Sequence, residues 1–590
     1  MTTAPSSGAA ARAPATGTAG DRPGRISIPA SVEACAEICR TLEQLDVSHV
    51  FGLPGTQNVA LFEALRRSRL RTIVPTHELA AAFMAGAYYR ACGRPGVLAT
   101  IGGPGLAYTI AGLAEARLDS AALVYLVNGR PANARIGYGL QALDQRALLA
   151  PVVKAVLAID GLDHAGDVMR HAFALALAGE PGPVAVELAS ESDDGSAVPP
   201  TLSRPTLDAE AAGRMWSRIT RARRPVLVLG QGALGAGPEV MALAERLQAP
   251  VLTTPSARGI VDERHPLAMG FDVLKGTLRA VNALLASSDL VVVLGAKLGH
   301  NGSAGFGLEL PAGATVRVDT SAEALASAYG ECDTLCADVG AFLAYPDARH
   351  VVPSAWPRRE IATWRGLVGN AIAGDAEPLI AGRSPRDVLA ELRQALPDDA
   401  MLVTDTGMHQ VLARRYFEVR APRGLLTPAD FQSMGFGLPA AIAAWLVQSS
   451  RPVVALLGDG GLRITGFELG TAVKARLGLP VIVFNDGRLN QIRLQQLAQY
   501  GVATATDIPV LDFAAFAASL GIDHVRTGRI DTGLIAAALA ADRPTLIEVP
   551  VGDSLAVATG ALRASARRHA RGLLTPALKR RLAALRPARS

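Results

Sequence analysis

The fold of this chain is decided by residues 456–493, LLGDGGLRITGFELGTAVKARLGLPVIVFNDGRLNQIR. This segment begins at the end of an apolar run over 452–457, which predicts a buried parallel strand. An acidic glycine turn over 458–461 follows, then a helix over roughly 465–476, a second apolar strand over 479–484 and an Asn-Asp-Gly turn. In an open parallel sheet, both turns lie at the edge where such sheets bind ligands.

Two aspartates, Asp459 and Asp486, follow the two predicted strands and are 27 positions apart. They supply hard oxygen ligands, which suit Mg²⁺, an ion that binds through one or two carboxylates plus substrate phosphates. The glycines beside Asp459 let backbone amides approach a phosphate closely, and a helix N-terminus favours an anion. A lone Gly-Asp-Gly is usually an ordinary turn, but two such turns at this spacing predict a magnesium-bridged diphosphate site.

Gly-Asp-Gly, a helix and then Asn-Asp-Gly resemble the thiamine diphosphate motif of the superfamily that contains acetolactate synthases and 2-oxo acid decarboxylases. The resemblance implies that Mg²⁺ is bound by Asp459, Asp486 and the backbone carbonyl of Arg488. It also implies that Gly460, Gly461 and Asp486 lie against the diphosphate of the cofactor.

The segment from His77 to Arg90 has the pattern His-Glu-x-x-Ala-x-x-Met-Ala-x-x-Tyr-x-Arg. Taken alone, Glu78 is a first-turn glutamate of the kind that the helix dipole favours. The pattern resembles the cofactor-activating segment of the same family. This resemblance implies that Glu78 is catalytic, hydrogen-bonding the aminopyrimidine ring of thiamine and promoting loss of the proton from the thiazolium carbon.

Two further N-terminal residues are candidates by resemblance. Gly55 ends Phe-Gly-Leu-Pro-Gly, which is similar to the glycine turn of the family near the reacting centre. Gln141 stands where acetolactate synthases have Phe-Gln-Glu, although here the triplet is Leu-Gln-Ala. Gln141 is therefore either a catalytic residue that reaches the substrate or a loop amide that faces water.

Two C-terminal segments complete the candidate site. Gly407, Met408 and His409 follow an apolar strand, and they cradle phosphate oxygens in one interpretation, with His409 as a hydrogen-bond donor. The alternative for His409 is a surface-loop histidine. Met434 lies 25 positions before Asp459, as the large apolar residue of the family does, which implies that it wedges between the two rings of the cofactor. Its alternative is ordinary core packing.

The length and the alternation of strands and helices predict an α/β protein with three doubly wound parallel-sheet domains, because 590 residues are too many for one hydrophobic core. A proline-marked linker over 200–205 precedes the central domain. We expect a disordered tail over 1–29, a pyrimidine-binding domain over 30–195, a central domain over 205–350, a diphosphate-binding domain over 380–552 and a basic tail over 553–590.

Composition excludes several classes of protein. The net charge of +5 is small over this length, and no basic stripe is interleaved with aromatics, so we expect no nucleic-acid partner. No apolar run has the length of a membrane span, and the N-terminal tail lacks a signal sequence, which predicts a soluble cytoplasmic protein. The pairs Cys35/Cys39 and Cys332/Cys336 have helical spacing without a histidine cluster, which favours buried free thiols over a metal site.

The central domain leaves the presence of FAD open. Gly230-x-Gly232-x-x-Gly235 is similar to a dinucleotide fingerprint, which is a weak signal by itself. In the family the corresponding domain holds FAD in some members, ADP in others and nothing in many. Lys297 stands where flavin-binding members have arginine, and the segment that follows departs from theirs.

By resemblance, the chain decarboxylates a 2-oxo acid such as pyruvate and adds the product to a second carbonyl, as acetolactate synthases do. The sequence lacks the His-His pair of pyruvate decarboxylases, and Gln495 replaces the tryptophan of the biosynthetic enzymes. The alternatives are a related thiamine diphosphate-dependent decarboxylase, C–C hydrolase or acyl transferase, and a non-catalytic paralogue. The family also implies a homodimer or homotetramer in which Glu78 of one chain meets Asp459 and Asp486 of another.

Overall fold

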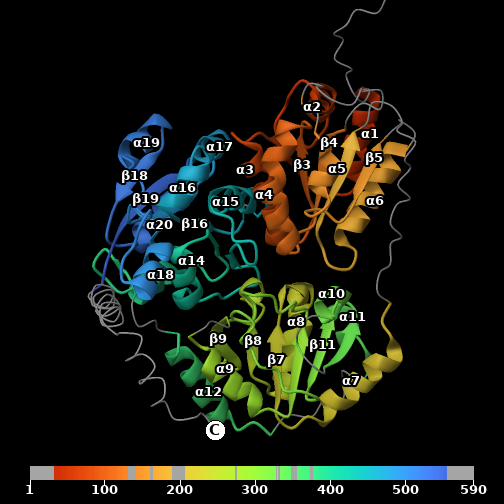
Figure 1. Ribbon diagram of the computed structural model, residues 1–590, viewed down its shortest axis with the longest axis vertical. Coiled ribbons are helices and arrows are strands. Elements are labelled where there is room, and N and C mark those ends of the chain that lie inside the picture. Colours follow the sequence, from red (N-terminus) through yellow and green to blue (C-terminus); the bar gives the residue numbers. More distant parts are fainter. Residues whose placement is uncertain are drawn as a thin grey trace, which may run out of the picture.

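The computed structural model contains three α/β domains (Figure 1). The predicted N-terminal tail, and the predicted C-terminal tail beyond residue 554, lie outside the described residues, so the two tail predictions remain predictions. The structure describes residues 32–129, 141, 143–159, 164–188, 206–272, 276–326, 329, 332–346, 355–372, 377–448 and 450–554.

The N-terminal domain is built on a parallel sheet with strand order β2-β1-β3-β4-β6-β5. The inner strands β1, β3, β4 and β6 are buried along their whole length, as expected for a sheet covered by helices on both faces. Its elements are α1 (Val32–Gln44), β1 (His49–Gly52), α2 (Val59–Arg67), β2 (Arg71–Ile73), α3 (Glu78–Cys92), β3 (Gly96–Thr100), α4 (Pro104–Leu118), β4 (Leu123–Asn128), α5 (Gln145–Leu149), β5 (Val156–Ile159), α6 (Ala165–Leu177) and β6 (Pro183–Leu188).

The central domain has a second parallel sheet, with strand order β12-β11-β10-β7-β8-β9. The chain order reverses between β7 and β10, which makes their carboxyl ends the switch point of the sheet. Its elements are α7 (Ala209–Arg221), β7 (Pro225–Leu229), η2 (Gln231–Ala236), α8 (Gly237–Leu247), β8 (Val251–Thr253), η3 (Pro255–Ala257), β9 (Ala268–Asp272), α9 (Leu278–Ala286), β10 (Leu290–Leu294), β11 (Thr315–Asp319), α10 (Ala322–Leu325), β12 (Asp333–Cys336), α11 (Val339–Leu343) and α12 (Arg358–Asn370).

The C-terminal domain has the strand order β13-β19-β17-β16-β14-β15, with β18 beside β19. Every pair in it is parallel except β13 with β19. Its elements are β13 (Leu379–Ile380), α13 (Pro385–Gln394), β14 (Met401–Thr404), α14 (Met408–Tyr416), β15 (Leu425–Leu426), α15 (Gly437–Val447), β16 (Val453–Gly458), α16 (Asp459–Thr465), α17 (Glu468–Lys474), β17 (Pro480–Asn485), α18 (Asn490–Tyr500), α19 (Phe513–Ser519), β18 (Asp523–Arg526), α20 (Thr532–Ala540) and β19 (Thr545–Gly552).

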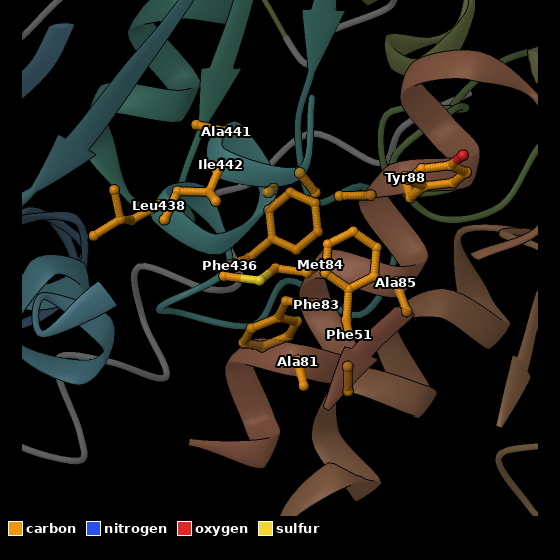
Figure 2. Close-up of a cluster of buried hydrophobic side chains, with 14 of the residues drawn as sticks. Phe51, Ala81, Phe83, Met84, Ala85, Tyr88, Phe436, Leu438, Ala441 and Ile442 are labelled. Carbon is orange, nitrogen blue, oxygen red and sulfur yellow. The ribbon is translucent and has the colours of Figure 1, made fainter. Parts of the chain in front are cut away.

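The N-terminal and C-terminal domains share one hydrophobic core, in which α3 packs against α15. Figure 2 shows the centre of this interface, where Phe83 of α3 faces Phe436 at the start of α15. The two rings meet edge to face, with centroids 5.6 Å apart, a favoured aromatic geometry. Alanine-rich faces on both helices allow this close approach. The central domain has a separate core of its own.

The α/β prediction with three doubly wound domains is confirmed, and two local predictions are wrong. The helix expected over 465–476 begins earlier: α16 starts at Asp459 itself, and α17 follows it. Gly461, within α16, packs so closely against Asp405 that a side chain there would collide with it. The second cysteine pair is not helical, since Cys336 ends strand β12 and Cys332 directly precedes it.

The other cysteine prediction is closer to the structure. Cys35 and Cys39 are buried on α1, and all five thiols of the chain are free. Cys92, Cys332 and Cys336 are only half-buried. Within the described ranges, no helix has both the length and the apolar character needed to cross a bilayer.

Candidate active site

The candidate site lies at the carboxyl edge of the C-terminal sheet, where β14, β16 and β17 end side by side. The register pairs Thr404 with Leu456 and Gly458 with Phe484, so the turns that follow the three strands come out at the same level. These turns enclose a cavity of about 270 Å³. Nine of the predicted residues line it, namely Gly407, Met408, His409, Met434, Asp459, Gly460, Gly461, Asp486 and Arg488.

The two aspartates are held by backbone amides. Asp459 accepts hydrogen bonds from the amides of Gly460 (2.9 Å) and Gly487 (2.8 Å), which ties the two acidic turns together. Asp486 accepts one from the amide of Arg488 at 3.1 Å. Burial raises the pKa of Asp459. Burial, and then the charge of Asp459, raise the pKa of Asp486 to about 6. A cation between the two turns would offset both effects.

Two buried polar atoms in the cavity wall lack a hydrogen-bond partner among the described residues. They are Nε2 of His409 and Oγ1 of Thr406. His409 is only 5% exposed, which contradicts the alternative of a surface-loop histidine. Burial lowers the pKa of His409 to about 4, so the ring is neutral at neutral pH. Since buried polar groups are nearly always satisfied, both atoms point to a polar ligand in the cavity.

The glycines of the cavity wall are needed for close packing. A β-carbon on Gly461 would lie 2.6 Å from Oδ2 of Asp405, which is itself fixed by the amides of Gly435 and Gly437. A β-carbon on Gly460 would lie 3.2 Å from the terminal methyl group of Met434. Met434 is half-buried, so it forms part of the cavity wall as well as packing against its neighbours.

Three predicted residues lie elsewhere. Glu78, Gly55 and Gln141 belong to the carboxyl edge of the N-terminal sheet, and none of them lines the cavity of the C-terminal domain in this single chain. Glu78 is the first residue of α3 and is half-buried. Gln141 accepts a hydrogen bond from Gln57 at 2.7 Å, and its backbone oxygen lies close to Gly103.

Gly55 and Gln57 belong to the loops at the carboxyl edge of the N-terminal sheet, beside Gln141. The amide of Gly55 donates to Asn58 at 2.7 Å, and Gln57 accepts from the amide of Gly102 at 3.0 Å. Gln141 and Gly55 are thus brought into one loop cluster. The structure describes Gln141 but neither of its neighbours, so the departures at Leu140 and Ala142 lie outside the described residues.

Within one chain, the buried carboxylate of Glu468 links the C-terminal domain to the N-terminal domain. Glu468 of α17 is 1% exposed and accepts hydrogen bonds from the amide and the hydroxyl of Thr76, two residues before Glu78. Thr471 donates to the same carboxylate at 2.7 Å. Glu468 therefore fixes the strand-to-helix junction that presents Glu78.

Sequence reasoning missed four polar residues of this region: Thr406, Gln432, Gln57 and Glu468. Thr406 lies between a predicted strand and the glycine turn at Gly407, and this position is a signal that could have identified it. Gln432 lines the cavity with a φ of +64°, a conformation that is uncommon for a residue with a side chain. Nothing in the local pattern around Glu468 indicated its partner 392 positions away.

No cluster of three or more histidine, cysteine or acidic side chains that could hold a metal ion occurs in the described part of the chain. The site instead offers two carboxylates and nearby backbone oxygens. This donor set fits Mg²⁺, which completes its octahedron with phosphate and water oxygens. It does not fit a structural zinc site, which needs four ligands from the protein.

Comparisons with known proteins agree with this arrangement. Family models for the thiamine pyrophosphate enzymes match residues 33–148 (N-terminal TPP binding domain), 213–345 (central domain) and 405–549 (C-terminal TPP binding domain).

Several curated proteins are similar over most of their length. The large subunit of acetolactate synthase isozyme 1 from Escherichia coli is 30% identical over 503 residues, covering 82% of this chain and 88% of that protein. The acetolactate synthase large subunit from Corynebacterium glutamicum is 29% identical, covering 93% and 91%. A probable 2-ketoarginine decarboxylase from Pseudomonas aeruginosa is 31% identical, covering 77% and 82%. The chain thus belongs to the thiamine pyrophosphate enzyme family and is an enzyme that resembles the large subunits of acetolactate synthases.

Proposed function

We propose that the cavity of the C-terminal domain holds the diphosphate of thiamine diphosphate together with Mg²⁺. The observation that carries this proposal is the convergence of Asp459 and Asp486 with two unsatisfied polar atoms, those of Thr406 and His409, in one cavity. When bound, the cofactor supplies a nucleophilic carbon and an electron sink for decarboxylation.

Each residue of the cavity has a defined part in holding this group. Asp459, Asp486 and the carbonyl of Arg488 bind Mg²⁺. The amides of Gly460 and Gly461 lie at the start of α16, where a helix N-terminus favours phosphate oxygens. Gly407 and Met408 begin α14 in the same way.

His409 and Met434 are the two remaining residues that contact the cofactor in this proposal. An anion beside Nε2 of His409 would raise the pKa of that ring and favour a protonated nitrogen that donates to it. Met434 supports the cofactor between its rings, because its methyl group already lies over the glycine turn. Both roles need side chains that other contacts hold in place, and both residues stand in the cavity wall.

The site is completed by a second copy of the chain. Glu78, Gly55 and Gln141 would then meet the partner's cavity, with Glu78 activating the cofactor and Gln141 facing the substrate. The apolar side chains of Ile464 and Phe467, which are 49% and 66% exposed on and beside α16, support such an interface. We therefore expect a homodimer or a homotetramer in solution.

The reaction that we propose is decarboxylation of a 2-oxo acid such as pyruvate, followed by addition to a second carbonyl. The names of the Escherichia coli and Corynebacterium glutamicum relatives support this acetolactate synthase-like outcome. Cytoplasmic localisation and the absence of a nucleic-acid partner stay predictions.

A second candidate is decarboxylation of a longer 2-oxo acid with a polar side chain. The relative named as a probable 2-ketoarginine decarboxylase supports it, as do the amide side chains of Gln432 and Gln491 in the cavity wall. Gln495 lies on α18, the helix that also carries Gln491, and Asn490 is the only buried residue of this helix.

The direct test is CO₂ release and product analysis with pyruvate, thiamine diphosphate and Mg²⁺. Acetolactate should form, and Glu78→Gln should abolish it. Glu239→Gln is the matched control, because Glu239 is an exposed first-turn glutamate of α8, outside both half-sites. Cofactor binding without pyruvate turnover would reject the acetolactate outcome, and turnover of guanidino or other polar 2-oxo acids would then establish the second candidate.

Co-expression tests the shared site. Glu78→Gln and Asp459→Asn are each expected to be inactive alone. In a mixed dimer one site combines the intact Glu78 of one chain with the intact Asp459 of the other, so activity should return. If each site were formed within one chain, every site in the mixture would carry a substitution and no activity would appear.

A further inference from the structure

The central domain carries a crevice at the carboxyl edge of its sheet, where the chain order reverses between β7 and β10. Ligands of open α/β sheets bind at such switch points, and this is where the family resemblance leaves FAD open. All three domains contribute to its walls. They include Leu118, Ser120 and Glu180 from the N-terminal domain, Gly230, Gln231, Lys297 and Asp319 from the central domain, and Ala429 and Asp430 from the C-terminal domain.

The backbone amides of the glycine turn after β7 are already used by the protein. The amide of Gly230 donates to the carbonyl of Leu294 at 2.9 Å, and that of Gly232 donates to Gly295 at 3.0 Å. The amide of Ala233 donates back to Gly230 at 3.0 Å. In a dinucleotide fingerprint, amides of this turn instead face the pyrophosphate.

The glycines also have a reason that involves no ligand. A β-carbon on Gly230 would lie 2.1 Å from the carbonyl oxygen of Gly295, and one on Gly232 would lie 2.9 Å from its α-carbon. The turns after β7 and β10 therefore press against each other. A β-carbon on Gly235 would meet no atom of the described residues within 4 Å, so close packing does not require the third glycine of the pattern.

Two side chains of the central domain cross the crevice to the N-terminal domain. Nζ of Lys297 donates to the carbonyl of Leu118 at 2.7 Å and forms an ion pair with Glu180 at 2.9 Å. Nε2 of Gln231 donates to the carbonyls of Asp119 (3.0 Å) and Ser120 (3.2 Å). We call Leu118–Ser120, Glu180, Gln231 and Lys297 the three-domain clasp.

The third domain joins at the same segment. The carboxylate of Asp119 accepts hydrogen bonds from the amides of Ala429 (3.2 Å) and Asp430 (3.0 Å) in the C-terminal domain. Arg90 forms a buried ion pair with this carboxylate at 2.5 Å. The clasp therefore holds all three domains through one short segment, Leu118–Ser120.

The charge of the crevice opposes a dinucleotide. Its lining holds the carboxylates of Asp119, Glu180, Asp319 and Asp430 and one ammonium group, that of Lys297. Arg90 neutralises Asp119, and Lys297 is engaged by Glu180, so Asp319 and Asp430, which form no ion pair with the residues that the structure describes, would face the phosphates of a nucleotide. Like charges at close range in a partly buried site are unfavourable.

The space is also too small. The cavity that remains measures about 110 Å³, whereas pockets that enclose drug-sized ligands span roughly 300–1,000 Å³. A volume of this size holds a few water molecules. Opening it for FAD would require breaking the contacts of Lys297 and Gln231.

We infer that the central domain of this chain binds neither FAD nor ADP, and that the three-domain clasp occupies the place of the nucleotide. This inference does not depend on the substrate or on the proposed thiamine diphosphate site, because it uses only residues of the crevice.

The first test measures nucleotide directly. The purified full-length chain is denatured with acid, and the supernatant is analysed for flavin and adenine nucleotides. The intact protein is also incubated with FAD or with ADP and then gel-filtered. We expect no retained nucleotide in either experiment, while thiamine diphosphate binding, measured separately by calorimetry, is unaffected by added FAD. Stoichiometric FAD or ADP after gel filtration would overturn the inference.

The second test addresses the clasp. Lys297→Met keeps the apolar stem of the side chain and removes the ammonium group. We expect the Tm to fall by about 2–4 °C, the shift expected for losing a part-exposed ion pair in a domain of this size. Lys474→Met, at an exposed lysine at the end of α17, is the control and should leave the Tm unchanged. Equal Tm values for Lys297→Met and the unmodified chain would show that the clasp does not hold the domains.

Discussion

Replacing Gly461 by alanine should damage the cofactor site through a single methyl group. Gly461 lies within α16, and its β-carbon would approach Oδ2 of Asp405 to 2.6 Å and Cγ to 2.8 Å. Asp405 cannot retreat easily, because it is only 1% exposed and its carboxylate accepts hydrogen bonds from the amides of Thr406, Gly435 and Gly437.

The expected size follows from two opposing effects. Overpacking costs about 1–3 kcal/mol, and alanine gains about 0.5–1 kcal/mol over glycine in a helix. The net loss should therefore be about 1 kcal/mol and at most about 2.5 kcal/mol, which corresponds to a decrease in Tm of about 2–4 °C at the central value for a domain of this size. The affinity for thiamine diphosphate should also fall, because α16 must shift away from Asp405.

Thermal unfolding and calorimetric titration with thiamine diphosphate and Mg²⁺ measure both quantities. The matched control is Gly366→Ala on α12, where the glycine is exposed and a β-carbon would meet no atom within 4 Å. That substitution should raise stability slightly and leave cofactor binding unchanged. If Gly461→Ala were as harmless as Gly366→Ala, the packing argument for the glycine turn would be refuted.

Three more predictions follow from buried groups. Glu468→Ala leaves the amide and hydroxyl of Thr76 without their acceptor, which should reduce the free energy of unfolding by about 1–3 kcal/mol. It should also lower kcat more than it raises KM, whereas Glu468→Gln should recover part of kcat. An equal loss of kcat in both variants would exclude a positioning role for Glu468. Burial, and then the charge of Asp119, raise the pKa of Glu115 well above its usual range. The stability that the protonated carboxyl contributes is therefore fully present at low pH, and it is lost as the pH rises above the ordinary pKa of a glutamate. The Tm of Glu115→Gln, measured from about pH 5 to about pH 8, should fall less steeply than that of the unmodified chain. Burial raises the pKa of Cys35 to about 11 and of Cys39 to about 12, so these thiols should react with iodoacetamide only after unfolding, and labelling of the folded protein would contradict their placement.

Much of the C-terminal half-site could be predicted from sequence, because its parts are local. A buried parallel strand and the turn after it are contiguous, so Asp459 and Asp486 could be assigned to one sheet edge from periodicity alone. His409 was ambiguous for the opposite reason: only its burial, which depends on β16 and Gly458 packing against the ring, distinguishes a site residue from a surface one.

Other features depend on contacts between distant segments. Local spacing placed Cys332 and Cys336 on a helix, although pairing of Asp333–Cys336 with β11 makes the segment a strand. The role of Glu468 also depends on a distant segment, because its hydrogen-bond partner Thr76 lies in another domain. The dinucleotide-like pattern at Gly230 has a different cause from the one that the local sequence suggests. Its first two glycines are needed for close contact with Gly295.

The way in which the domains are joined bears on how the enzyme holds its cofactor. The N-terminal and C-terminal domains are fused by apolar packing, with Phe83 and Phe436 at its centre, so their relative position is set by a continuous close-packed core. The central domain has a separate core and meets the others through polar contacts, which include the Lys297–Glu180 ion pair at the clasp and the buried side chain of Arg258, which donates to the carbonyl of Phe417 in the C-terminal domain. A domain boundary held by polar contacts opens at a lower free energy than a continuous apolar core does. Motion of the central domain should therefore leave the junction at Thr76 and Glu468, and with it the position of Glu78, unchanged.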